Sequence, residues 1–260
     1  MNKENYLRRI GFEKSDLAPT ADNLRLLQRR HLLHVPFENL DIHWRRPIAL
    51  DEDAFYRKIV ERRRGGFCYE LNGLFAALLT EIGFQCRLVS ARVYQNENRF
   101  GAEYDHLAIL ARVGEDEYLV DVGFGSFAAA SLKFVPDLVQ KDENGTFIVR
   151  RYDENYFEIA KMDGSDWKSE YIFTPRARAL AEFAGMCEFH QTSPESHFTR
   201  GKVCSLMTET GRKTLTDRQF IETRAGRKIE TGVETEEEFE RILAREFGIE
   251  RALETARERG

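Results

Sequence analysis

The first 84 residues carry the apolar spacing of α-helices. Leu27 and His31 lie on one face behind Thr20, whose hydroxyl suits an N-cap, and Pro36 stops this pattern. The clearest helix follows a pair of glycines and ends at Gly83. Its apolar face consists of Leu71, Phe75, Leu78, Leu79 and Ile82. The spacing therefore predicts an N-terminal part that is mainly helical.

From Cys86 onward the apolar period changes from about 3.6 to 2, which is typical of β-strands. Gly, Asn and Asp occupy the turns between these segments. The pattern predicts an antiparallel meander or a small barrel. The strands are expected at residues 86–94, 106–113, 117–124, 146–152, 155–160 and 167–173.

The last part of the chain mixes both periods. A helix is expected over 176–190, and Thr235 with Glu238 forms the capping box of a final helix that ends at Gly248. Short strands are expected between these helices, at residues 202–208, 213–217, 219–224 and 227–232. Helices, then strands, then a mixed region predict an α+β fold in three closely packed parts.

The composition excludes several classes of protein. The 260 residues include 39 Lys and Arg against 44 Asp and Glu, so the net charge of −5 lacks the positive field that nucleic-acid binding needs. No apolar run approaches the length of a membrane span, and the first residues lack the apolar core of a signal peptide. The four cysteines include no CxxC pair. We expect a cytoplasmic protein without nucleic-acid or membrane partners.

Cys68 is the first candidate for chemistry. It follows Gly65-Gly66 and lies in the first turn of the clearest helix, where unpaired N–H groups favour negative charge. A thiol at such a position, with a histidine nearby, can have its pKa lowered from about 8.5 to roughly 3.5–7.5. The alternative is a small buried apolar residue, which is the usual role of a free cysteine.

A histidine and an aspartate could serve this thiol. Gly114-Glu115 fits a two-residue type II′ turn, which pairs Val113 with Asp116 and places His106 and Asp121 on one face of the hairpin. Their Cβ atoms would then be roughly 7–8 Å apart, a gap that an imidazole can bridge. A register slip of one residue would separate them. The alternative is a surface histidine and an aspartate near a turn.

Taken together, RGGFCYELN around Cys68, DHL around His106 and VDVGFG around Asp121 resemble the arylamine N-acetyltransferase family. Segments 35–43 and 193–206 are also similar to that family, so the resemblance covers most of the chain. It implies a helical bundle over 1–84, an antiparallel β-barrel over 85–190 and an α/β lid over 191–260. The bundle and barrel would form a cysteine-proteinase-like core.

The resemblance also implies a ping-pong reaction. Acetyl-coenzyme A would acetylate Cys68, His106 would act as the base, and Asp121 would orient the imidazole. An arylamine or hydrazine would then take the acetyl group. This scheme needs no metal, and the sequence contains no cluster of zinc-ligand spacing.

Further residues acquire roles through the same resemblance. Phe37 and Val93 match positions that line the acceptor pocket, although their pattern alone indicates core residues. The loop after Asp121 lies where coenzyme A enters, although its composition also fits a simple turn at a strand end. This loop consists of Gly123, Phe124, Gly125 and Ser126.

Other conspicuous residues have simpler interpretations. Glu70 and Asn72 are expected to brace the helix of Cys68, and Arg64 to make structural contacts within an otherwise solvated basic run. The remaining histidines are interpreted as structural or surface residues: His31, His34, His43, His190 and His197. Cys86, Cys187 and Cys204 are interpreted as buried small residues.

Two alternatives to acetyl transfer remain open. A Cys–His–Asp hydrolase of the papain or transglutaminase type would use water instead of an amine to resolve the acyl-enzyme. A non-catalytic ligand-binding relative would retain only the fold. The sequence identifies neither the natural acceptor amine, nor the preferred acyl donor, nor the oligomeric state.

Overall fold

The helix that carries Cys68 lies at the centre of the N-terminal part. The computed structural model describes residues 1–13, 17–96, 99–125 and 127–251. Helix α5 begins at Cys68 itself and ends at Gly83, whose φ of 108° is accessible to glycine without strain. The helical elements before the barrel are α1 (Lys3–Arg9), α2 (Ala21–His34), α3 (Leu40–His43), α4 (Glu52–Tyr56), the π-helical turn η1 (Arg57–Glu61) and α5 (Cys68–Ile82).

The predicted helix boundaries of this region are confirmed. The Thr20 hydroxyl accepts a hydrogen bond from the Asn23 backbone at the start of α2. The Asp51 carboxylate does the same for Ala54 at the start of α4. The apolar spacing did not predict the π-helical turn after α4, which directs Lys58 into the interior.

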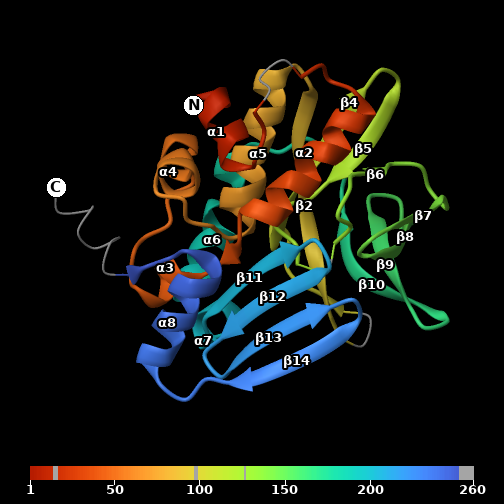
Figure 1. Ribbon diagram of the computed structural model, residues 1–260. Helices are drawn as coiled ribbons and strands as arrows, with labels where there is room; N and C mark the ends of the chain where they lie inside the picture. Colours follow the sequence, from red (N-terminus) through yellow and green to blue (C-terminus); the bar gives the residue numbers. More distant parts are fainter. Residues whose placement is uncertain (14–16, 97–98, 126, 252–260) are drawn as a thin grey trace.

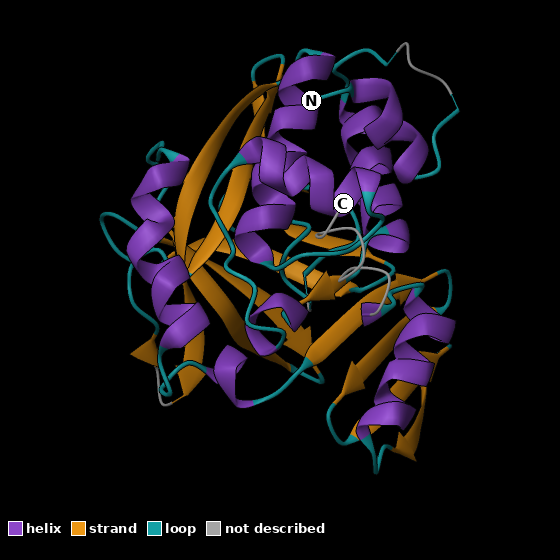
Figure 2. Ribbon diagram, turned by 90° about the vertical axis from the view of Figure 1, so that its left-hand side faces the viewer, coloured by secondary structure: helices purple, strands orange, loops and turns teal. Residues whose placement is uncertain are grey.

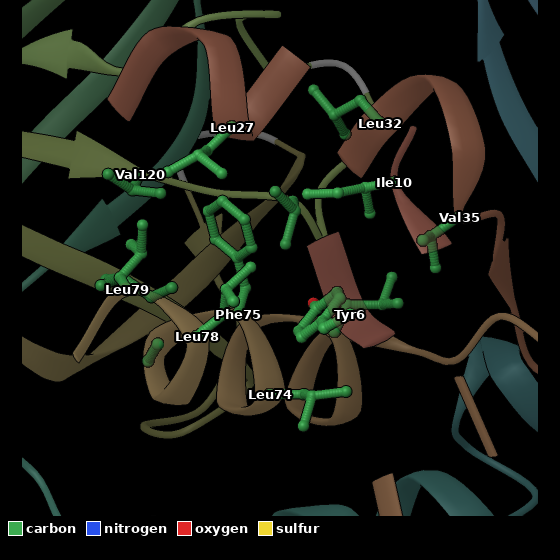
Figure 3. Close-up of a cluster of buried hydrophobic side chains, with 14 of the residues drawn as sticks. Tyr6, Ile10, Leu27, Leu32, Val35, Leu74, Phe75, Leu78, Leu79 and Val120 are labelled. Atoms are coloured by element: carbon green, nitrogen blue, oxygen red, sulfur yellow. The ribbon is translucent and has the colours of Figure 1, made fainter. Parts of the chain in front are cut away.

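Helix α5 is buried between the other helices and the barrel. Figure 3 shows side chains of α1, α2, α5 and β5 meeting in one cluster, with Tyr6, Leu27, Phe75 and Val120 among them. Since α5 is buried on almost every side, small shifts of this helix are opposed by close packing. That packing fixes the position of Cys68 at its first turn.

A nine-stranded antiparallel sheet forms a nearly closed barrel in the middle of the chain (Figure 1). Its order is β6-β5-β4-β2-β10-β9-β8-β7, and β3 also pairs with β2. The Gln140 side chain on β7 donates to the Lys133 carbonyl on β6 and accepts from its N–H, at 2.9 and 2.7 Å. One amide side chain thus links the two ends of the sheet.

The strands of this sheet are β2 (Gln85–Asn96), β3 (Arg99–Phe100), β4 (His106–Val113), β5 (Asp116–Val120), β6 (Leu132–Lys133), β7 (Val139–Asp142), β8 (Gly145–Arg151), β9 (Phe157–Asp163) and β10 (Asp166–Phe173). Of these, β2, β4, β5, β8, β9 and β10 correspond to predicted segments, although β5 ends at Val120, before the expected residue 124. The short strands β3, β6 and β7 were not predicted.

The β4–β5 hairpin has the predicted register. Val113 pairs with Asp116 and Ile109 with Val120, and Gly114 at the turn has a φ of 61°. Continuation of this register brings His106, at the start of β4, beside Asp121, which follows β5. The local turn chemistry therefore positions both residues at one end of the hairpin.

A five-stranded sheet and a helix form the C-terminal part, in which the last four strands and the final helix are drawn in blue in Figure 1. Its order is β1-β11-β12-β13-β14, and all four C-terminal strands were predicted. The first strand comes from the N-terminal region, where Phe37 pairs with Ser205 of β11. The elements are β1 (Phe37–Glu38), η2 (Leu180–Phe183), α6 (Ala184–Thr192), α7 (His197–Arg200), β11 (Val203–Thr208), β12 (Gly211–Thr216), β13 (Gln219–Arg224), β14 (Arg227–Gly232) and α8 (Glu236–Phe247).

The N-terminal part is mainly helical, as predicted, and also contributes the short strand β1 to the C-terminal sheet. One expectation needs correction. The helix expected from residue 176 begins only at Leu180, because Arg178 N–H donates to the Leu88 carbonyl at 2.9 Å and keeps this stretch extended along β2. The α+β class is as predicted, with helices packed against sheets (Figure 2). The domain limits at 84 and 190 stay a prediction.

No helix in the described ranges is long and apolar enough to cross a bilayer.

A buried histidine links folding to pH. His31 on α2 is fully buried, with Nδ1 3.0 Å from the Tyr6 hydroxyl and its ring against Phe75. Burial lowers its pKa from the usual 6.5 to about 3. Between these values the unfolded chain binds the extra proton, so its contribution to stability is complete above pH 6.5 and falls as the pH drops toward 3.

We predict that His31→Gln flattens this dependence. The amide can still accept from Tyr6 but does not titrate, so it removes a slope of up to about 1.4 kcal/mol per pH unit. Urea unfolding between about pH 7 and pH 5 measures the slope for both proteins. An equal slope in the variant would mean that His31 does not resist protonation in the folded state.

Candidate active site

Cys68 is held at the N-terminus of α5 by close backbone packing. The Phe67 N–H, at the N-cap, donates to a Glu70 carboxylate oxygen at 3.0 Å. A Cβ atom at Gly65 would lie only 2.0 Å from the Pro36 carbonyl oxygen, so a side chain there would force β1 and α5 apart. This close approach explains the glycine before the helix. The Cys68 side chain is 3% exposed and faces the cavity described below.

His106 and Asp121 form a buried pair beside this thiol. The His106 Nε2 lies 2.7 Å from Asp121 Oδ2. With Nε2–H donating to the carboxylate, Nδ1 is the imidazole nitrogen left to accept a proton. His106 and Cys68 line the same cavity, so the structure brings together the three residues that the sequence singled out.

The Asp121 carboxylate is fully buried and accepts four hydrogen bonds. Oδ2 accepts from His106 and from the Tyr171 hydroxyl, the latter at 3.2 Å. Oδ1 accepts from Asn72 Nδ2 at 2.8 Å and from the Gly123 N–H at 2.9 Å. Donors from a helix, a strand and a loop therefore hold this charge in one orientation.

Asn72 joins the helix of the thiol to the hairpin of the His–Asp pair. It lies four residues after Cys68, hence on the same face of α5. Its Nδ2 also donates to the Leu107 carbonyl at 2.6 Å, and its Oδ1 accepts from the Val122 N–H at 2.9 Å. The expected bracing role of Asn72 is thus observed. Tyr171, on β10, is a contact that sequence reasoning missed.

A buried ionic network braces the start of α5 from the opposite side. Lys58 Nζ lies 2.9 Å from both Glu70 carboxylate oxygens and 2.7 Å from Asp41. Although burial lowers the pKa of Lys58, the carboxylates around it raise that pKa above its usual value. Arg64 is 1% exposed and pairs with Glu38 and Asp41 at 2.6 and 3.0 Å. Arg64 therefore makes structural contacts, as predicted.

The sequence suggested a lowered pKa for the Cys68 thiol. This expectation is wrong for a site whose imidazole is uncharged. Burial raises the pKa of Cys68 well above its usual value, and the carboxylates of Asp121 and Asp105 raise it further. The Leu107 N–H opposes this effect but is outweighed. The thiol therefore does not lose its proton to water near neutral pH. Burial therefore opposes a thiolate at this site unless a neighbouring positive charge offsets it.

A cavity of about 580 Å³ opens above Cys68. Apart from the buried Asp121, every described residue predicted for the site lines it: Cys68, His106, Gly123, Phe124, Gly125, Phe37 and Val93. A Cβ atom at Gly123 would lie 2.8 Å from the Cys68 Cα, so the bare backbone is what allows this approach. Ser126 lies outside the described residues.

The sequence did not reveal a further part of the cavity lining. This part comes from segment 197–203 and from the β12–β13 turn, and it includes three basic residues, Arg200, Lys202 and Arg218. His197, expected to be structural or a surface residue, also lines the cavity. His190 lies behind it, 3.2 Å from the Asp105 carboxylate. The one available signal was the resemblance of segment 193–206.

The described part of the chain contains no group of three or more His, Cys, Asp or Glu that could hold a metal ion.

Comparisons with known proteins agree on one family. A family model described as N-acetyltransferase matches residues 20–256. Human arylamine N-acetyltransferase 1 is 31% identical over 96% of this chain and 94% of its own length. The arylamine N-acetyltransferase of Mycolicibacterium smegmatis is 30% identical over 96% of this chain and 92% of its own. The Mycobacterium marinum enzyme in complex with CoA superposes with a TM-score of 0.87, at 29% identity, covering 95% of this chain and 93% of that one.

We predict that Asp121→Asn slows alkylation of Cys68 by iodoacetamide at about pH 7 by at least tenfold. The amide cannot stabilise an imidazolium that would take the proton of the thiol. Although the substitution removes one charge that raises the pKa of Cys68, burial is the larger cause and still keeps the thiol protonated. Peptide mapping separates Cys68 from the other cysteines. Asp116→Asn, at the turn of the same hairpin, is the control because its side chain is 48% exposed and pairs with Lys133. Equal rates in wild type and Asp121→Asn would show that Asp121 has no part in activating the thiol.

Proposed function

This chain belongs to the arylamine N-acetyltransferase family, and from that premise we propose that the acetyl group passes through Cys68 on its way to the amine. Members of this family are transferases that acetylate arylamines. The observation that carries the proposed route is the 2.7 Å contact between His106 and the buried Asp121, beside the cavity that Cys68 lines. In this arrangement Cys68 is the nucleophile, His106 the base and Asp121 the orienting carboxylate.

In the first half-reaction the Cys68 thiol transfers its proton to His106. The sulfur attacks the carbonyl carbon of acetyl-coenzyme A, and a new C–S bond forms. The C–S bond to coenzyme A then breaks, and the leaving thiolate takes the proton from the imidazolium. Asp121 stabilises the imidazolium throughout because its four donors hold the carboxylate in place.

In the second half-reaction the amine nitrogen attacks the acetyl-Cys68 carbonyl. The C–N bond forms as the C–S bond breaks, and His106 takes the proton from the nitrogen and returns it to the departing sulfur. The products are the N-acetylated amine and free Cys68. Besides the two substrates, these steps involve the side chains of Cys68, His106 and Asp121. Because the pKa of Cys68 is raised, its sulfur becomes reactive only when His106 can take the proton.

Two features support coenzyme A entry over the loop at Gly123–Gly125. The relative from Mycobacterium marinum has a structure in complex with CoA. In this chain, the cavity that this loop lines is also lined by Arg200, Lys202 and Arg218, whose charges suit a phosphorylated donor. We assign Gly123, Phe124, Gly125 and Ser126 to donor binding as part of this proposal.

The acceptor is proposed to lie against Phe37 and Val93. Phe124 and Phe198 line the same cavity, so an aromatic amine meets apolar and aromatic side chains on several sides. A hydrazine with an aromatic group meets the same requirement. Acceptors of this class include xenobiotic amines.

We further propose a cytoplasmic enzyme whose partners are its two small-molecule substrates, not nucleic acid or a membrane. The unpaired state of Cys68, Cys86, Cys187 and Cys204 supports a reducing compartment. The net charge of −5 disfavours binding to a polyanion.

We predict that wild type releases coenzyme A from acetyl-coenzyme A in proportion to added arylamine, and that Cys68→Ala abolishes this release. Cys68→Ser should be nearly inactive, because a hydroxyl ionises far less readily than a thiol. A thiol-trapping dye follows coenzyme A, and chromatography follows the acetylated amine. Cys86 is half-buried and lies outside the cavity, so Cys86→Ala is the matched control and should retain turnover.

Two results would contradict the proposal. Substantial turnover by Cys68→Ala would exclude the covalent route. Coenzyme A release by wild type that is independent of amine would instead indicate a hydrolase, and the absence of any release would indicate a ligand-binding relative.

A further inference from the structure

The cavity wall contains a carboxylate that the proposed reaction does not use. Asp105 immediately precedes His106, lines the cavity, and has a side chain that is 15% exposed. The buried Asp121, not Asp105, holds the His106 imidazole. Asp105 therefore places a second negative charge beside the reacting groups without taking part in the Cys–His–Asp arrangement.

The surrounding backbone fixes the position of the Asp105 carboxylate. Its Oδ2 accepts from the Val93 N–H at 3.3 Å, and a Cβ atom at Gly101 would lie 2.1 Å from that oxygen. The Tyr69 hydroxyl donates to the carbonyls of Tyr104 and Asp105, at 2.7 and 3.3 Å. The carboxylate is thus held against Val93, on the part of the wall assigned to the acceptor.

Asp105 has limited compensation for its charge. Its Oδ1 lies 3.2 Å from His190 Nε2, and the other His190 nitrogen is 3.2 Å from the Ser196 hydroxyl. No arginine or lysine within the described ranges forms an ion pair with Asp105. The described partners of the Asp105 carboxylate are thus the Val93 N–H and a histidine.

The other carboxylate of the cavity lining is compensated. Within the described residues this lining contains Asp105 and Asp217. Asp217 follows β12, and its Oδ2 accepts from the Lys202 N–H at 2.5 Å while its Oδ1 is 3.4 Å from Lys202 Nζ, which also pairs with Glu236. Of the two carboxylates in the described lining, Asp217 therefore has a lysine partner, whereas Asp105 pairs with a histidine.

The field of Asp105 reaches the reacting sulfur. After burial and Asp121, the Asp105 charge is the next contribution that raises the pKa of Cys68. An acceptor close enough to attack acetyl-Cys68 therefore lies within the same field. The cationic side chains of the same lining, Arg200, Lys202 and Arg218, affect the pKa of this sulfur less than Asp105 does.

We propose that Asp105 determines acceptor specificity by charge: it favours aromatic amines whose ring substituent is cationic and disfavours those that carry a carboxylate. This inference rests on the proposed function, since it concerns the amine that resolves acetyl-Cys68. The acceptors of this chain are then aromatic amines without an anionic substituent.

The test compares three acceptors that differ in charge at one ring position. These are 4-aminobenzoate, its neutral isostere 4-aminobenzamide, and (4-aminophenyl)trimethylammonium. The three acceptors differ in intrinsic nucleophilicity, but this difference is the same for wild type and variant and therefore cancels. The readout is the factor by which the ratio of kcat/KM for two acceptors changes from wild type to Asp105→Asn at about pH 8. We expect the benzoate-to-benzamide ratio to rise by at least about tenfold, and the trimethylammonium-to-benzamide ratio to fall correspondingly.

Matched variants separate this effect from a change of structure or net charge. Asp217→Asn removes the same charge from the same cavity, but its carboxylate faces Lys202, so both ratios should change less than about twofold. Asp105→Glu keeps the charge and should retain the wild-type order of acceptors. Equal shifts in Asp105→Asn and Asp217→Asn, or no shift in either, would overturn the proposal.

A second measurement needs no variant. Phenyltrimethylammonium and benzoate cannot accept an acetyl group, and each can be titrated as a competitor of 4-aminobenzamide on wild type. The cation should compete at least about tenfold more tightly. Equal competition, or tighter binding of benzoate, would overturn the inference while leaving the acetyl transfer intact. Failure of wild type to acetylate even 4-aminobenzamide would instead contradict the proposed function and the inference with it.

Discussion

The orientation of one buried carboxylate governs the arrangement of the site. Asp121 is fully buried, and its charge requires compensation that only nearby donors can supply. His106, Asn72, Gly123 and Tyr171 supply it from different parts of the chain, and each is thereby fixed relative to the others. The hairpin, α5 and β10 meet where these donors converge. The loss of one donor would leave the carboxylate undercompensated, so the constraint is stringent.

Two polar systems hold the nucleophile from opposite sides of α5. Asn72 joins the helix to the hairpin, and Glu70 joins it to Lys58 in the ionic network. Buried networks of this kind add little net stability, because desolvation offsets the attraction between the charges. Their effect here is geometric, since they locate Cys68 relative to His106. The raised pKa of the thiol follows from the same burial. In the proposed reaction the sulfur therefore becomes reactive when its proton passes to His106.

The sequence predicted the features that depend on local chemistry. Caps at Thr20 and Gly83 determined helix ends, and the turn at Gly114 determined the register that brings His106 beside Asp121.

Features that depend on contacts between distant segments were not predictable. Tyr171 lies 50 residues from Asp121 in sequence, and β1 pairs with a strand far along the chain. No spacing rule relates such segments. For the same reason, the basic cavity wall and the pairing of Asp105 with His190 became visible only in the folded structure. The thiol pKa was mispredicted because a helix N-terminus is read from sequence, whereas the degree of burial is not.

The acetyl-enzyme tests the central claim most directly. Intact-protein mass spectrometry after rapid mixing with acetyl-coenzyme A, without amine, should show one added acetyl group. Peptide mapping should place it on the peptide that contains Cys68, and an arylamine should remove it. Asp121→Asn should form the adduct far more slowly, because His106 can no longer hold the proton of the thiol. Acetylation of an arylamine without any adduct under rapid quench would mean direct transfer between substrates, which contradicts the role assigned to Cys68.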